Sequence, residues 1–370
     1  MKVAIVHDWF VELGGAEKVV QQLVTLFPNA DLFSTVDYMS DKSFILNKKI
    51  YTTFIQKLPG SKKYQKYFPM MPFALENLDL RKYDLIISSS SSVAKCILSG
   101  PDQLHICYCH SPMRYAWDLQ EEYLEQIGSA KGFKSYIYRY LLYKMRTIDV
   151  RTSNSVDYFI ANSNYISKRI QKVYRRESQV IYPNVEVQDF TVVKEKREFY
   201  FTCSRLVPYK RIDLIVKAFS QMPDKKLVVI GDGPEMKKIK AIATNNVELL
   251  GYQPFTVLKE YMENAKAFVF AAQEDFGIVP VEAQACGTPV IAYGKGGSLE
   301  TVVNGVTGVH FYEQTEKSLI DAVNYFESSK ALDPNEIREH ANKFSTERFL
   351  KEFRNFVIDK FEEHLGDKAQ

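Results

Sequence analysis

Short apolar runs alternate with amphipathic helical patterns along the whole chain. Each apolar run is bounded by turn or polar residues and is followed by a segment with helical periodicity. This alternation predicts parallel strands with helices on both faces of the sheet. The strands predicted for the first half are residues 3–6, 31–35, 85–88, 105–109 and 158–161. Those predicted for the second half are residues 199–203, 226–230, 247–250, 267–270, 289–292 and 309–311.

The same pattern divides the chain into two domains of similar size. Pro183-Asn184 ends the first series of elements, and the charged residues 194–198 precede the strand that begins the second. A length of 370 residues also favours two domains over one large core. We therefore expect an α/β fold of two doubly wound domains, residues 1–184 and 185–345, facing each other across a cleft. The segment 346–370 resembles one amphipathic helix with no strand after it, so it is free to pack elsewhere, including back on the first domain.

Composition and charge exclude several classes of protein. Apolar residues make up 46% and charged residues 25% of the chain, which excludes disordered, collagen-like and coiled-coil proteins. The 48 Lys and Arg against 45 Asp and Glu give a net charge of +3, too balanced to favour duplex nucleic acid as a partner. No apolar run reaches the roughly 20 residues of a membrane-spanning helix, and the run after Lys2 is too short for a signal peptide. We expect a cytoplasmic protein, either soluble or peripheral on the inner face of the cell membrane.

The cysteines point to a reducing compartment. All five lie among apolar or small residues, as buried free thiols do: Cys96, Cys107, Cys109, Cys203 and Cys286. The C-x-C pair lies on one predicted strand with both thiols on one side. No second Cys or His pair lies at ligand spacing, so a metal site is disfavoured there.

Basic residues are concentrated in the first half of the chain. Residues 1–190 contain 24 basic and 19 acidic residues, whereas residues 191–370 contain 24 and 26. The excess lies in residues 42–82 and 131–151, and the second stretch also carries Phe133 and four tyrosines. Basic residues interleaved with aromatics on a helix are typical of segments at an anionic membrane surface. The alternative interpretation is a solvated helix whose tyrosines pack on the core.

The strongest candidate for a chemical site follows the strand predicted to end near Phe270. Pro280 is expected to lie in the first turn of a helix, where an amide donor is dispensable, so the amides of Gly277, Ile278 and Val279 lie at the helix N-terminus. Such amides, together with the helix dipole, form an anion site. Two carboxylates flank this site, from Glu274 just before it and Glu282 about one turn inside the helix, and they could hold sugar hydroxyls. The alternative is one capping glutamate and one surface glutamate.

A second candidate combines two cations beyond the strand 199–203. Arg205 and Lys210 follow that strand and lead into a helical pattern. Ligands of open α/β sheets bind beyond the carboxyl ends of strands. There, an arginine fork and a lysine point charge suit a diphosphate. A solvated pair of basic residues is the alternative.

Four further strand ends carry turn or polar residues. Gly14-Gly15 opens the first helix, which we expect to run to about Leu26, but the motif is not G-x-G-x-x-G, so a dinucleotide site is disfavoured. The run 231–235 has two glycines and a proline, which predicts a tight turn whatever the function. His110 lies where polar and aromatic residues crowd a strand end, which favours a site over the structural role that a lone histidine usually has. The serines 88–92 are interpreted as a plain strand-end turn, with a ligand crevice as the alternative.

Taken in order, these motifs resemble those of the retaining glycosyltransferases of family 4, which have the GT-B fold. The family's E-x7-E pair corresponds to Glu274 and Glu282, and its S-R-L-x-x-x-K element to residues 204–210. Its glycine-rich first loop corresponds to Gly14-Gly15, and two further motifs match residues 282–292 and 296–300. Within the family, the run 109–118 most resembles bacterial mannosyltransferases that build O-antigen and related polysaccharides, including lipopolysaccharide.

The resemblance implies a role for each matching residue. Arg205 and Lys210 would grip the donor diphosphate, assisted by Gly14, Gly15 and the backbone of Phe276, Gly277 and Ile278. Glu274 would contact the donor sugar, and Glu282 the nucleotide ribose. His110 would act beside the sugar, from a first domain that takes the acceptor. The catalytic set implied is therefore His110, Glu274, Arg205 and Lys210.

The resemblance also implies a reaction. A sugar, for which mannose from GDP-mannose is the expectation and a UDP-sugar the alternative, would pass with retention of configuration to a lipid-linked or glycan acceptor. The fixed charges of Arg205 and Lys210 can stabilise the departing diphosphate, and no Asp-x-Asp occurs in the chain, so neither a metal nor a cofactor is expected. Contact with an anionic inner membrane is a further expectation, and nucleic acid is not an expected partner. A sugar-nucleotide epimerase and a non-catalytic nucleotide-sugar sensor are the other functional classes considered.

Overall fold

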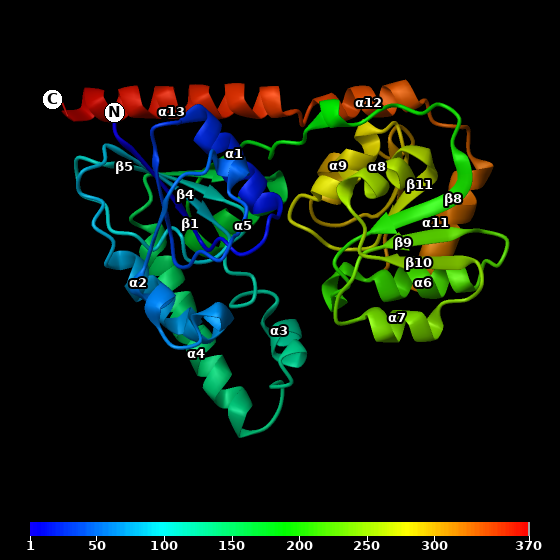
Figure 1. Cartoon of the computed structure of the whole chain (residues 1–370), viewed down its shortest axis with the longest axis horizontal. Coiled ribbons are helices and arrows are strands. Elements are labelled where there is room, and N and C mark those ends of the chain that lie inside the picture. The colour runs from blue at the N-terminus through cyan, green and yellow to red at the C-terminus, as the bar shows by residue number, and fades with distance from the viewer. Residues whose placement is uncertain (369–370) are drawn as a thin grey trace. The chain divides into compact units, whose positions relative to one another are not determined.

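The computed structural model describes residues 1–368, which form two compact units (Figure 1). The first unit comprises Met1–Asn184 together with the chain from Phe349 onward, and the second comprises Val185–Arg348. In the described chain each unit holds one sheet in which every strand pair is parallel. The predicted parallel α/β architecture is therefore confirmed.

The first unit contains a seven-stranded sheet in the order β3-β2-β1-β4-β5-β6-β7. Its strands are β1 (Val3–His7), β2 (Asp31–Ser34), β3 (Ile50–Thr52), β4 (Leu85–Ser90), β5 (Leu104–Cys109), β6 (Tyr158–Ala161) and β7 (Ser178–Val180). The sequence pattern found five of these strands and missed the two edge strands, β3 and β7. Each of the two has only three residues, and neither forms a continuous apolar run.

Helices cover both faces of this sheet, because successive side chains of a strand point to opposite faces. The helices are α1 (Gly15–Leu26), α2 (Met71–Glu76), α3 (Gln120–Gln126), α4 (Phe133–Ser153), α5 (Asn164–Tyr174) and α13 (Thr346–Lys368), with 3₁₀ helices η1 (Ser43–Ile45), η2 (Phe54–Lys57) and η3 (Ser61–Met70). Val3 and Ile5 of β1 pack in one cluster with residues of α1 and α13, whereas Ala4 and Val6 pack with residues of α2 and α4.

The C-terminal helix α13 supplies part of the first unit's core. Phe349 and Phe353 are fully buried, and their rings lie 6.0 and 6.2 Å from the ring of Tyr108 in β5. Figure 1 shows α13, in red, passing along the first unit beside α1. The helix therefore completes a core that the first 184 residues begin.

The second unit contains a six-stranded sheet in the order β10-β9-β8-β11-β12-β13. Its strands are β8 (Arg197–Cys203), β9 (Leu227–Ile230), β10 (Val247–Gly251), β11 (Ala265–Phe270), β12 (Val290–Tyr293) and β13 (Gly308–Phe311), and all six were predicted. Its helices are α6 (Ile212–Ser220), α7 (Met236–Ile242), α8 (Phe255–Asn264), α9 (Ile278–Ala285), α10 (Ser298–Thr301), α11 (Glu316–Ser328) and α12 (Pro334–Asn342), with 3₁₀ helices η4 (Val187–Asp189) and η5 (Pro208–Lys210).

Both sheets have a point at which the strand order reverses. In the first unit it lies between β1 and β4, and in the second between β8 and β11. Loops leaving neighbouring strands in opposite directions open a crevice at such a point, beyond the carboxyl ends of the strands. The predicted site residues follow these strands, or β5 beside them.

Two interpretations made from the sequence concern α4 and the cysteines. The tyrosines of the basic stretch 131–151 do not pack on the core, because Tyr136, Tyr138, Tyr140 and Tyr143 are all exposed. The core-packing part of that alternative is therefore wrong, because other residues take the core-facing positions of α4. The five cysteines are buried and free, as expected. None of the described helices is both long and apolar enough to span a bilayer.

Candidate functional site

In the second unit, the loops after β8 and β11 meet through an ion pair. The Lys210 ammonium at the end of η5 contacts the Glu274 carboxylate, which lies in the loop between β11 and α9. Each side chain is about four-fifths buried. Arg205, from the same loop as Lys210, is exposed. The structure thus joins two of the predicted residues across the reversal point of the sheet.

The loop that carries Arg205 is held by the glycine-rich turn after β9. The amide of Leu206 donates to the carbonyl of Asp232 at 2.9 Å, and the amide of Glu235 donates to the carbonyl of Leu206 at 3.0 Å. Gly231 has a φ of +140°, and a Cβ there would lie 1.8 Å from the carbonyl oxygen of Ser204. Because the glycines of this turn have no side chains, its backbone packs directly on the loop of Arg205. The turn therefore supports that loop as well as reversing the chain.

Helix α9 begins shortly after Glu274 along the chain. Gly277 is the N-cap, with a φ of +88°, and the helix starts at Ile278 as the sequence predicted. The first amides of a helix have no partner within the helix, so they and the dipole favour an anion. Phe276 is buried, and its ring lies 5.5 Å from that of Phe344. This packing fixes the backbone that leads into the helix.

Glu282 is buried within α9, with 7% of its surface exposed. The alternative interpretation of this residue as a surface glutamate is therefore wrong. Its position one turn inside the helix suits a hydrogen-bond acceptor for hydroxyl groups.

The glycine pair after β12 clamps the Glu274 loop from the other side. The amide of Gly297 donates to the carbonyl of Glu274 at 2.8 Å, and a Cβ on Gly297 would lie 2.4 Å from the Cα of Phe276. Backbone therefore packs directly on backbone at this point. The E-x7-E loop is held by the motif 296–300 in the same way that the Arg205 loop is held by the turn after β9.

The first unit gathers a second polar group where β1, β4 and β5 end. Gly14 is the N-cap of α1, and its amide donates to a carboxylate oxygen of Glu17 at 2.9 Å. The other oxygen of Glu17 lies 3.2 Å from Nε2 of His7, the last residue of β1. Burial acts to lower the pKa of His7, but the hydrogen bond and charge of Glu17 outweigh it, so the pKa of His7 is raised. Burial likewise acts to raise the pKa of Glu17, and the His7 hydrogen bond outweighs it, so that pKa is lowered.

His110 joins this group through Ser89. Nε2 of His110 lies 2.8 Å from Oγ of Ser89, and Nδ1 of His7 lies 3.2 Å from the same oxygen and 3.1 Å from the Ser89 carbonyl. Burial and the nearby His7 lower the pKa of His110 to about 3, so its ring is neutral near pH 7. When Nδ1 of His7 donates its proton to an oxygen of Ser89, the Ser89 hydroxyl can donate in turn to Nε2 of His110. The proton of the neutral His110 ring then resides on Nδ1.

The serine run is not a plain strand-end turn. Ser88, Ser89 and Ser90 belong to β4 and are buried. Beyond them, the carboxylate of Asp8 accepts hydrogen bonds from the amides of Ser91 and Val93 at 2.6 and 2.7 Å. The run therefore connects β4 to the loop after β1, and it contributes a hydroxyl to the group around His110.

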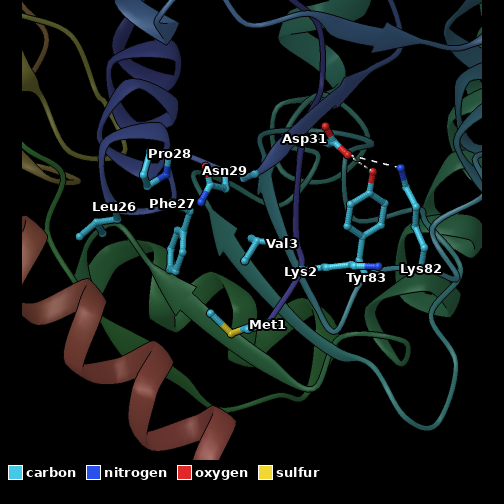
Figure 2. Close-up of a pocket in the computed structure, with 11 residues that line it drawn as sticks. Met1, Lys2, Val3, Leu26, Phe27, Pro28, Asn29, Asp31, Lys82 and Tyr83 are labelled. Atoms are coloured by element: carbon cyan, nitrogen blue, oxygen red, sulfur yellow. Dashed lines mark hydrogen bonds and ion pairs between the residues drawn. The ribbon is translucent and has the colours of Figure 1, made fainter.

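Two cavities of the first unit are distinct in chemistry. One, of about 400 Å³, lies where β1 and β2 begin, which is the edge opposite to His110 (Figure 2). Asp31 there pairs with Lys82 at 3.5 Å and accepts a hydrogen bond from the hydroxyl of Tyr83 at 2.5 Å. Both contacts are drawn as dashed lines in Figure 2. The other cavity, of about 490 Å³, is lined by residues of α4, α5 and the chain before α3, among them three cations: Arg146, Arg169 and Lys172.

Charge compensation in the second cavity is incomplete. Arg169 pairs with Asp118 and also donates to the Ser111 hydroxyl at 3.0 Å. Arg146 donates to two neutral acceptors, the carbonyl of Ala116 and the side-chain oxygen of Gln120, both at 2.7 Å. This second cavity therefore favours an anionic group, and Ser111 places it next to His110 along the chain.

Sequence reasoning found the second-unit residues but missed much of the first-unit group. His7, Glu17 and Ser89 were not predicted as site residues. One signal was available, since a glutamate three residues after an N-cap is typical of a side chain that reaches back to the cap. The contacts of Ser89 with His7 gave no signal, because 82 residues separate the two.

Comparison with known proteins places these features in a family. Residues 13–189 match the model of Glycosyltransferase Family 4, and residues 185–347 match that of Glycosyl transferases group 1. An uncharacterized glycosyltransferase of Methanocaldococcus jannaschii is 30% identical over 53% of this chain and 58% of its own length. The alpha-1,3/1,6-mannosyltransferase of Kluyveromyces lactis is 24% identical over 96% of this chain and 84% of its own length.

Solved structures agree on the fold. HepE of Anabaena, in complex with UDP, has a TM-score of 0.73 at 18% identity, with 97% of this chain and all of that chain covered. The sucrose-phosphate synthase of Thermosynechococcus elongatus also has a TM-score of 0.73 at 18% identity, covering 98% of this chain and 99% of that one. The expected GT-B class of fold is confirmed by these likenesses.

Proposed function

From the premise that the chain belongs to the family 4 and group 1 glycosyltransferases, we propose that it transfers a sugar from a nucleotide donor to a hydroxyl of a glycan acceptor. The observation that carries this proposal is the group at the reversal point of the second sheet. There the cation Lys210 and the carboxylate Glu274 come together, in front of the N-terminus of α9. A diphosphate needs the cation and the amides of the helix N-terminus, and a sugar needs the carboxylate.

The charges of this group suit departure of a nucleoside diphosphate. As the bond between the anomeric carbon and the phosphate oxygen breaks, the electron pair remains on the diphosphate. Preorganised positive groups near that oxygen stabilise the charge as it develops. Lys210, Arg205 and the amides that follow Phe276 would supply them. In the structure Lys210 pairs with Glu274. In the donor complex, we assign the ammonium to the phosphate and the carboxylate to sugar hydroxyls.

We propose that transfer retains the anomeric configuration and requires no metal. The acceptor oxygen would attack on the face from which the diphosphate leaves, and the departing phosphate oxygen would take the acceptor's proton. His110 would bind the sugar rather than donate a proton, because a pKa of about 3 keeps its ring neutral near pH 7. Glu282 would accept hydrogen bonds from the ribose.

GDP-mannose is the donor that we propose. The mannose is supported by the mannosyltransferase among the relatives, at 24% identity. The GDP is supported by a GDP-mannose-dependent mannosyltransferase of Corynebacterium glutamicum, which is 38% identical over 27% of this chain. A UDP-sugar is the second candidate, since HepE was solved with UDP. A thermal-shift panel of GDP-, UDP- and ADP-sugars separates the two, because a bound donor stabilises the fold by mass action. Stabilisation by UDP-sugars alone would overturn the assignment of GDP-mannose.

A lipid-linked saccharide is the proposed acceptor, in the synthesis of a cell-surface polysaccharide. The second cavity supports it, because Arg146 brings a positive charge whose hydrogen-bond acceptors there are neutral. A diphosphate between lipid and sugar would satisfy that charge. Arg146→Gln should raise the KM for a diphosphate-linked acceptor and leave the KM for the donor unchanged. An unchanged acceptor KM would contradict this assignment.

One incubation distinguishes transfer from the other classes considered. The protein is given radiolabelled GDP-mannose, with and without lipid-linked acceptor. Label in the lipid fraction indicates a transferase, a converted sugar on the nucleotide indicates an epimerase, and an unchanged donor that still binds indicates a sensor. Either of the last two outcomes would overturn the proposed function.

A further inference from the structure

The outer face of α4 has an unusual composition for a helix at a protein surface. Two stripes run along this helix. Buried residues recur at helical spacing along one side, namely Ser135, Leu142, Met145, Asp149 and Thr152. The opposite side would ordinarily be polar.

Aromatic side chains occupy that opposite side instead. Phe133, Tyr136, Tyr140 and Tyr143 follow one another at intervals of three or four residues, so they lie on one face. Their exposed fractions are 80%, 74%, 58% and 54%. We call this set, with the exposed Ile137, the aromatic stripe of α4. Large aromatics that gather on a surface in this way mark an interaction site.

Three exposed lysines accompany the aromatic stripe, whereas Arg139 of α4 is paired with the exposed Glu121 of α3. Lys131, Lys134 and Lys144 are exposed, and the Lys144 ammonium lies over the rings of Tyr140 and Tyr143, 5.4 and 6.0 Å from their centres. The one acidic residue of the stretch, Asp149, is buried and pairs with the buried Lys95. It therefore contributes no negative charge to the outer face. A partner of this surface must be apolar enough for the rings and negative enough for the lysines.

The position of the helix makes the stripe accessible within its unit. Figure 1 shows α4 running away from the sheet of the first unit, so that its N-terminal end lies farthest from the strands. The other basic stretch, residues 42–82, belongs to the same part of the unit, since Tyr64, Tyr67 and Phe68 pack in one cluster with Leu142 and Met145 of α4.

We propose that the aromatic stripe and lysines of α4 dock the first unit on a bilayer surface that contains anionic lipids. Tyrosine rings favour the headgroup region, where an apolar body and a polar tip are both accommodated. A phenylalanine ring beside them is buried at the boundary with the acyl chains. Lysines beside them are attracted by the negative surface potential. Docking would bring the first unit to a lipid-linked acceptor, and only this consequence rests on the proposed function.

Vesicle flotation tests the docking directly. The full chain is mixed with vesicles of phosphatidylcholine alone, or of phosphatidylcholine with an equal amount of phosphatidylglycerol. We expect flotation with the second kind, and a decrease as salt is added, because salt screens exposed charges. Absence of flotation with the vesicles that contain phosphatidylglycerol would overturn the proposal.

Variants of α4 locate the contact. Each lysine near an anionic surface is worth about 1 kcal/mol, so Lys134→Gln with Lys144→Gln should weaken binding by roughly 30-fold. Tyr136→Ser with Tyr140→Ser should also reduce flotation. These side chains are exposed, so the fold should survive, which circular dichroism checks. The matched controls are Tyr252→Ser, at a ring that is 80% exposed in the second unit, and Lys237→Gln at an exposed lysine there. Equal loss in the controls would overturn the assignment to α4.

Other occupants of the stripe are outcomes of the same experiments. If the wild type self-associates in sedimentation and Tyr136→Ser with Tyr140→Ser abolishes this while flotation persists, the stripe binds a second copy and the proposal is wrong. Transfer is measured separately on a detergent-solubilised acceptor. If the wild-type chain transfers sugar but does not float with anionic vesicles, the docking alone is overturned. If it floats but transfers no sugar, the proposed function alone is overturned.

Discussion

Replacement of Lys210 by alanine tests the assignment of the donor site most directly. In the structure this ammonium contacts Glu274 and is about four-fifths buried. The substitution removes one positive group from the place where a diphosphate charge would develop, and it leaves the carboxylate without this partner. Catalysis and stability should therefore respond by different amounts.

The magnitudes follow from the burial of the pair. Loss of one preorganised donor from a developing oxyanion costs about 3–4 kcal/mol, which predicts a fall in kcat of about 100- to 1,000-fold. The pair is neither fully exposed nor fully buried. Its loss should therefore cost stability between the 0–1 kcal/mol of an exposed ion pair and the roughly 3–5 kcal/mol of a broken buried pair. Lys210→Arg keeps the charge and should retain more activity than Lys210→Ala.

The assay is transfer from radiolabelled donor, with kcat and KM measured separately and unfolding followed in urea. Lys226→Ala is the matched control, since Lys226 forms an ion pair with Glu248 at 2.8 Å in the same unit and has no assigned role. That control should keep full activity. A folded Lys210→Ala variant with wild-type kcat would refute the reasoning, and so would an equal loss in the control.

Three further predictions concern the same groups and the requirement for a metal. Ser89→Ala removes the hydroxyl that contacts His110, a hydrogen bond worth about 0.5–1.5 kcal/mol, so kcat should fall by roughly tenfold or less; unchanged kinetics would contradict a role for Ser89 in positioning His110. Gly297→Ala forces a Cβ onto the backbone of Phe276 and should lower stability by about 1–3 kcal/mol in urea unfolding, with a further loss of donor affinity. Transfer should survive EDTA, and strict dependence on added Mg²⁺ or Mn²⁺ would disprove the metal-free proposal.

The sequence located the strand-end motifs of the second unit because each of them is local. The N-terminus of α9, its glycine cap and the cations after β8 all lie within a few residues of a strand end that the apolar pattern reveals. Strand alternation and helix start signals act over the same short range. The helix Gly15–Leu26 was placed correctly for this reason. By contrast, β3 and β7 are short edge strands that pair on one side only, so they need no apolar run.

Tertiary structure decided what the side chains at those positions do. The group of Glu17, His7, Ser89 and His110 exists because β1, β4 and β5 end beside one another, although they are far apart in sequence. Packing likewise decided that Glu282 is buried and that the rings of α4 are exposed. A helical pattern gives the spacing of residues on a face, but which face meets the core depends on the elements packed against it. Local sequence therefore determined the elements and the chemistry at strand ends, whereas long-range packing determined which groups share a site and which remain exposed for a partner.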